Sequence, residues 1–116
     1  MLDLQEMARE SEQTAREHGF DDDAVAIKRR LRDFPVELAA FERYLKLAKL
    51  MLVTTELAEA AEAVRNGDHS NYGEELADVV IRVGHESFRN GLDLSVVVAE
   101  KQAVNKARPI RHGKLI

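Results

Sequence analysis

The sequence contains no cysteine, and this absence excludes disulfide bridges and thiolate metal sites. It has only two prolines and six glycines, so long stretches contain no residue that breaks a helix. No apolar run is long enough to span a membrane, and the N-terminus lacks the pattern of a signal peptide. The net charge of -4 argues against nucleic-acid binding, which requires clustered positive charge. We therefore expect a cytoplasmic protein that binds neither membrane nor nucleic acid.

The residues that are present have the proportions of an ordinary globular protein, with 45% hydrophobic and 33% charged residues. A chain of 116 residues is most simply one domain with its own core. We therefore expect residues 1–116 to form a single domain.

Hydrophobic periodicity predicts helices and no strands. The expected helices cover residues 2–18, 24–31, 35–65, about 72–89 and about 94–107. Gly19, Asn66-Gly67 and Asn90-Gly91 are expected to end helices, and Pro109 cannot continue the last one. The predicted N-terminal capping residues are Asp33 for the long helix, Asn71 with Glu74 for the next helix, and Asp93 or Ser95 for the last.

The expected long helix is apolar on two sides, and at 31 residues it would be about 46 Å long. One stripe contains Leu38, Phe41, Leu45, Ala48 and Leu52, and the other contains Leu47, Leu50, Val53, Leu57, Ala60 and Val64. Such a helix must be covered by neighbours on both sides. We therefore predict an all-α fold, an antiparallel four-helix-type bundle around a long central helix over residues 35–65, completed by oligomerisation.

Two pairs of carboxylates mark consecutive helices. Glu56 and Glu59 are three residues apart near the end of the long helix, and Glu75 and Asp78 have the same spacing on the next. Residues three apart share one face of a helix, and helices joined by a short turn run antiparallel. The two pairs therefore face each other, and their mutual repulsion requires a cation. Ligands that are all carboxylates select Mg²⁺, with Mn²⁺ as a substitute.

The expected last helix carries two cations and an amide on one face, at Lys101, Asn105 and Arg108. Beside a magnesium site this face is suited to binding phosphate, although it could equally be a solvated basic helix end. A di-iron site is disfavoured, because no histidine follows a glutamate by three residues. His85 is expected to be a surface or internally bonded histidine rather than a ligand.

These motifs resemble the MazG-like family of all-α nucleoside triphosphate pyrophosphohydrolases. The family hallmark is Glu-x-x-Glu followed, after a spacer, by Glu-x-x-Asp; here the motifs start at Glu56 and Glu75 and are separated by fifteen residues. The contexts ELAEA and EELADVVIRV, the segment GLDL, and the ending KQAVNKARP with RHGK are also similar to this family. The resemblance covers about residues 47–114, and Thr55 stands where several members have a further acid.

The resemblance implies hydrolysis of a nucleoside triphosphate to the monophosphate and pyrophosphate, in a homodimer or homotetramer. It implies that Glu56, Glu59, Glu75 and Asp78 hold Mg²⁺, that Glu56 or Glu59 also acts as general base, and that Lys101, Asn105 and Arg108 bind the phosphates. A house-cleaning role in the nucleotide pool is consistent with this activity. The alternatives are a phosphoribosyl-ATP-type pyrophosphohydrolase and a non-catalytic helical interaction module with acids at its surface.

Overall fold

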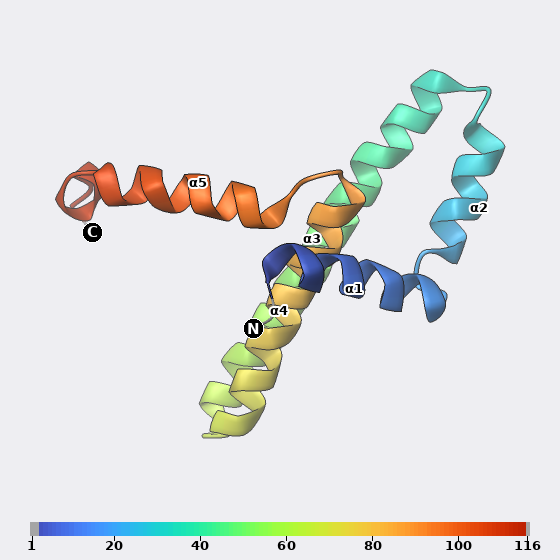
Figure 1. Ribbon diagram of the computed structural model, residues 1–116. Coiled ribbons are helices and arrows are strands. Elements are labelled where there is room, and N and C mark those ends of the chain that lie inside the picture. Colours follow the sequence, from blue (N-terminus) through green and yellow to red (C-terminus); the bar gives the residue numbers. More distant parts are fainter. Residues whose placement is uncertain (1–2, 116) are drawn as a thin grey trace.

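The computed structural model describes residues 3–115, which form an all-α fold (Figure 1). The elements in chain order are α1 (Leu4–Glu17), α2 (Asp22–Leu31), α3 (Pro35–Arg65), α4 (His69–Arg89), α5 (Leu94–Ala107) and a short 3-10 helix, η1 (Ile110–Gly113). The prediction of an all-α class with a long helix over residues 35–65 is confirmed. The expected start of the first helix at residue 2 lies outside the described residues. Among those residues, no helix combines the length and apolar character required to cross a membrane.

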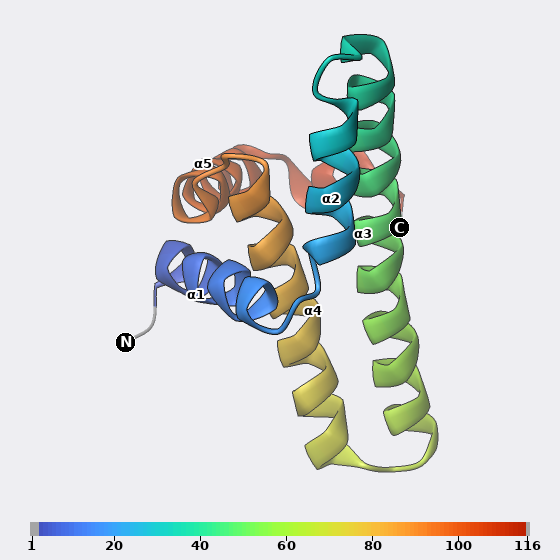
Figure 2. The same ribbon diagram turned by 90° about the vertical axis from the view of Figure 1, so that its right-hand side faces the viewer.

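Helices α3 and α4 form an antiparallel hairpin along the long axis of the molecule (Figure 2). The turn between them is tight: Gly67 has φ +68°, and Asp68 follows it as the capping residue of α4. The Asp68 side chain accepts a hydrogen bond from the Asn71 backbone N–H at 3.0 Å. The hairpin therefore brings the C-terminal part of α3 beside the N-terminal part of α4, where the two acidic pairs lie.

Helix α1 lies across α4 and packs closely against it (Figures 1 and 2). This contact depends on Gly84, because a Cβ atom there would lie 2.8 Å from the Met7 sulfur and 3.2 Å from the Ala8 Cα. Met7, Ala8 and Ser87 are buried at the same place. A glycine in the interior of a helix is thus explained by close helix packing.

Helix α2 runs beside the N-terminal half of α3, whereas α5 projects away from the hairpin (Figures 1 and 2). The N-terminal end of α5 is held to α1 by two hydrogen bonds. The Gln5 backbone N–H donates to Ser95 Oγ at 3.0 Å, and the Leu94 N–H donates to Gln5 Oε1 at 2.9 Å. Asp93 caps this helix, as predicted.

Two of the predicted caps are wrong. The long helix begins after Phe34, with no side-chain cap from Asp33. Helix α4 begins at His69 rather than after Asn71, because Asp68 caps it directly after the glycine turn. At the start of α4 several polar residues in a row could cap, and local sequence does not decide among them. Helix α2 starts at Asp22, within the acidic run of residues 21–23, whose carboxylates suit a helix N-terminus.

The core of the described chain is small. Its buried apolar residues are Met7, Ala8, Ala15, Ala60 and Ala63, and no large side chain among residues 3–115 is fully buried. By contrast, twenty-two large hydrophobic residues are exposed over the same range. On α3 they include both sides of the helix: Val36, Tyr44, Leu47, Leu50, Met51, Leu52, Leu57 and Val64. A single chain therefore leaves much of the two-sided helix uncovered.

Candidate metal centre

The hairpin brings three of the four predicted metal ligands together. Each of Glu56, Glu75 and Asp78 offers a carboxylate oxygen, and these oxygens lie within 4.8 Å of one another. Glu56 comes from α3 and is buried, while Glu75 and Asp78 come from α4, one turn apart. These three residues have the geometry expected for two acidic pairs facing each other across the hairpin.

The three carboxylates have fewer positively charged partners than negative charges. Glu75 Oε2 is buried and has no hydrogen-bond partner. Burial and the neighbouring carboxylates of Glu59, Asp78 and Glu56 together raise the pKa of Glu75 to about 7, with burial the largest cause. A raised pKa means that the ionised cluster is electrostatically unfavourable in the absence of a cation.

Glu59, the fourth predicted ligand, lies beside this set rather than within it. Its side chain is exposed, but its hydrogen bonds influence the pKa of both Glu56 and Glu75. Glu59 is therefore a neighbour of the three carboxylates and is more open to solvent than Glu56.

One cation, Arg82, is paired with the cluster. Its Nε donates to Glu56 Oε1 at 2.6 Å, and the Glu56 side chain is 9% exposed while that of Arg82 is 41% exposed. This hydrogen bond holds the pKa of Glu56 below its ordinary value, against the opposite effect of burial. No motif in the sequence singled out Arg82, because its partner Glu56 lies 26 residues away on the neighbouring helix.

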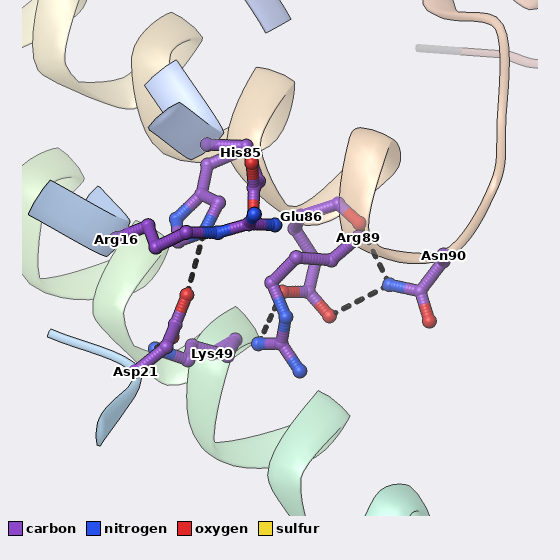
Figure 3. A network of polar contacts seen from close by, with 8 residues as sticks. Arg16, Asp21, Lys49, His85, Glu86, Arg89 and Asn90 are labelled. Atoms are coloured by element: carbon purple, nitrogen blue, oxygen red, sulfur yellow. Dashed lines mark hydrogen bonds and ion pairs between the residues drawn. The ribbon is translucent and has the colours of Figure 1, made fainter. Parts of the chain in front are cut away.

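A second group of charges lies further along the same helices, around Asp21 (Figure 3). Asp21 accepts hydrogen bonds from Lys49 Nζ at 3.0 Å and from the His85 ring at 3.2 Å. Burial alone would raise the Asp21 pKa, but the hydrogen bond and charge of Lys49 and the charges of His85 and Arg89 hold it below its ordinary value. Asp21 thus joins the corner between α1 and α2 to both helices of the hairpin.

Near Asp21, both carboxylate oxygens of Glu86 also have partners (Figure 3). Asn90 Nδ2 donates to Glu86 Oε1 at 2.9 Å, and Arg89 Nη1 pairs with Oε2 at 3.4 Å. No local pattern predicts the pairs of Asp21, because its partners are 28 and 64 residues away.

A pocket of about 600 Å³ separates the two groups of charges and is lined by residues of α1, α3 and α4. Its apolar lining comes from Met7, Ala15, Phe20, Leu52 and Ile81. Glu56, Asp78 and Arg82 form one part of the wall, and Lys49 and His85 form another. This volume is in the range of small-molecule sites, and an apolar wall with a few convergent charges is typical of them.

The predicted phosphate-binding residues do not join this site within one chain. Lys101 and Asn105 are exposed on α5, the helix that projects away from the hairpin, and Arg108 is exposed directly after it (Figure 1). None of them lines the pocket beside the carboxylates. The Arg108 guanidinium instead contacts His112 Nδ1 at 3.0 Å.

Comparisons of the chain with models of protein families, with curated proteins and with solved structures find no match. The resemblance to the MazG-like family therefore stays a prediction from the motifs.

Proposed function

We propose that this protein hydrolyses a nucleoside triphosphate to the monophosphate and pyrophosphate with the help of Mg²⁺. The observation that carries the proposal is the convergence of Glu56, Glu75 and Asp78 from two helices, with a buried Glu75 oxygen that has no partner. Carboxylate oxygens are the ligands that Mg²⁺ prefers, and Mn²⁺ accepts the same set.

The residues fit a divalent cation on chemical grounds. Glu56, Glu75 and Asp78 would hold it, with Glu59 available beside them. When bound, the cation would supply charge neutralisation for a triphosphate and lower the pKa of a bound water. Of the two predicted bases, Glu59 is the better candidate, because the hydrogen bond from Arg82 lowers the pKa of Glu56 and makes it a weaker base.

The pocket supports a nucleotide as the substrate. Its apolar wall, with Phe20 at the corner after α1, suits a flat base, and the carboxylates at one side suit a metal-bound phosphate chain. Phosphoribosyl-ATP and deoxynucleotides contain the same elements, so they belong in the same test as the common triphosphates.

We further propose that the active form is a homodimer or homotetramer. The two-sided apolar surface of α3 and the small core favour a partner that covers this surface. A second copy could also bring the basic face of α5 to the carboxylates, which α5 of the same chain does not do. Sedimentation equilibrium should therefore give a mass of at least two chains, and a monomer at micromolar concentration would contradict the proposed assembly.

The activity is tested with a panel of nucleotides and Mg²⁺, with separate detection of pyrophosphate and nucleoside monophosphate. We expect both products, in equal amounts, from at least one triphosphate. Glu59→Gln should lose activity, while Glu62→Gln, one turn later on the same helix and exposed, should retain it.

Two results would contradict the proposal. If no triphosphate yields either product, the protein is not this enzyme, and the non-catalytic interaction module becomes the better hypothesis. If Glu59→Gln and Glu62→Gln are equally active, the reaction does not use Glu59. A magnesium-dependent rise in melting temperature separates these cases, because binding to the folded state must stabilise it.

A further inference from the structure

Arg82 is the residue whose pairing the proposed reaction does not explain. It lies four residues after Asp78 and seven after Glu75, so all three side chains lie on one side of α4. Its guanidinium bonds to Glu56 on the neighbouring helix and also lines the pocket. Arg82 therefore lies on the pocket wall together with Glu56 and Asp78, beside the space where a ligand would bind.

The other basic side chains of the pocket have partners outside the cluster. Lys49 and His85 both bond to Asp21, at 3.0 and 3.2 Å. Arg82 is the one of these three that neutralises the carboxylate cluster, through the 2.6 Å contact with Glu56. A divalent cation beside Glu56 would repel this guanidinium, because like charges a few ångströms apart at a partly buried site are only partly screened by solvent.

The Arg82 side chain has room to adopt a different rotamer. It is 41% exposed, whereas Glu56 is 9% exposed, so rotation of Arg82 requires little change in packing while Glu56 stays fixed. A guanidinium that leaves a carboxylate on the wall of a pocket is placed to bind a phosphate, which it can do through two parallel hydrogen bonds.

We propose that Arg82 exchanges partners: it neutralises Glu56 while the cluster holds no metal, and it binds an anionic phosphate when a divalent cation takes its place. Arg82 is then a phosphate-binding residue that links metal binding to phosphate binding. This inference rests on the proposed function for the identity of the anion, but competition between Arg82 and a cation does not depend on hydrolysis.

The first test is titration with Mn²⁺ alone, followed by electron paramagnetic resonance of the free ion. Arg82→Gln should bind Mn²⁺ about tenfold more tightly than the wild type, within the 5–150-fold range typical of coupled sites. Arg82→Lys keeps the charge and should stay near the wild type. Arg65→Gln makes the same charge change on an exposed residue of α3 and should have no effect.

The second test is binding of inorganic pyrophosphate at saturating Mn²⁺, measured by calorimetry. Here Arg82→Gln should bind about tenfold more weakly than the wild type, so the same substitution changes the two affinities in opposite directions. A purely structural salt bridge would weaken both affinities or neither, and either result overturns the proposal.

Folding of the variant is followed separately. Metal-free Arg82→Gln should melt at a lower temperature than the wild type, and Mn²⁺ should remove this difference. If neither protein binds Mn²⁺, the exchange is wrong. If Mn²⁺ and pyrophosphate behave as expected but no nucleotide is hydrolysed, the exchange stands and the proposed enzymatic function fails.

Discussion

Two groups of charged side chains lie on the same pair of helices and differ in how their charges are balanced. The Asp21 group has Lys49 and His85 around one carboxylate, and it holds the corner between α1 and α2 against the hairpin. The cluster of Glu56, Glu75 and Asp78 has one cation, Arg82, for three carboxylates. The pKa of Asp21 is lowered, whereas that of Glu75 is raised to about 7.

The difference indicates two roles for buried charge. Where each charge has a partner, the group stabilises the fold by joining distant segments. Where carboxylates outnumber their partners, their mutual repulsion disfavours the ionised cluster, and the proposed cation would relieve that repulsion; perturbed pKa values of this kind are typical of functional sites. Substitutions in the two groups should therefore have opposite effects on stability.

The largest effect is expected for Asp78→Asn. Removing a residue that only hydrogen-bonds to a metal ligand costs about 10–100-fold in metal affinity or activity. Removing a proposed ligand itself should therefore reduce hydrolysis by at least about 100-fold. Without metal, however, the variant should be as stable as the wild type or more stable, because one of several crowded negative charges is removed. Activity assays and thermal melts in EDTA measure the two effects. An unfolded variant would show that Asp78 instead has a structural partner.

The converse is expected for Asp21→Ala. It leaves Lys49 and His85, both largely buried, without their acceptor, and hydrogen bonds to charged groups are worth about 1.5–3 kcal/mol. We expect a loss of about 2–3 kcal/mol in urea unfolding and little change in Mn²⁺ affinity. Asp23→Ala, at an exposed neighbour, is the matched control. A large loss of Mn²⁺ affinity in Asp21→Ala would mean that the two groups are not separate.

Two glycines of α4 test whether the α1 contact is as tight as the structure indicates. Gly84→Ala should destabilise the protein by about 1–2 kcal/mol, because the new methyl group overlaps Met7 and overpacking costs about 1–3 kcal/mol. Gly73→Ala meets no atom within 4 Å and should stabilise by up to about 1 kcal/mol through helix propensity. Urea unfolding of both variants gives the comparison. Equal effects would mean that α1 does not pack against Gly84 in solution.

The smallest effect expected is on the pH dependence of stability in EDTA. The folded pKa of Glu75, about 7, is above its ordinary value of 4.5. The Glu75 contribution is therefore greatest at low pH and decreases as the pH rises through 4.5 to 7. The pKa of Asp21 is below its ordinary value of 3.8, so its contribution is present above that pH and is lost as the pH falls below it. Melting temperatures of Glu75→Gln should lack the decrease between pH 5 and about 7, and Mg²⁺ should abolish it in the wild type.

Much of the candidate site could be predicted because its information is local. The spacing of Glu75 and Asp78 on one helix, and a glycine turn that makes two helices antiparallel, are enough to place both with Glu56. The prediction that Lys101, Asn105 and Arg108 bind phosphate rests on the family resemblance and on the helix face that they share. Neither the resemblance nor the shared face determines the direction in which α5 runs. That direction depends on contacts of Gln5 with Leu94 and Ser95, about 90 residues away in sequence.

The sequence by itself determined the all-α class, the limits of the long helix and the pairing of carboxylates across the hairpin, because helix periodicity and glycine turns are short-range properties. Only the tertiary structure decided that Arg82 pairs with Glu56, that Asp21 joins three segments, and that α1 packs on Gly84. Those contacts depend on where helices cross, and crossing points are set by side-chain packing between segments far apart in the chain.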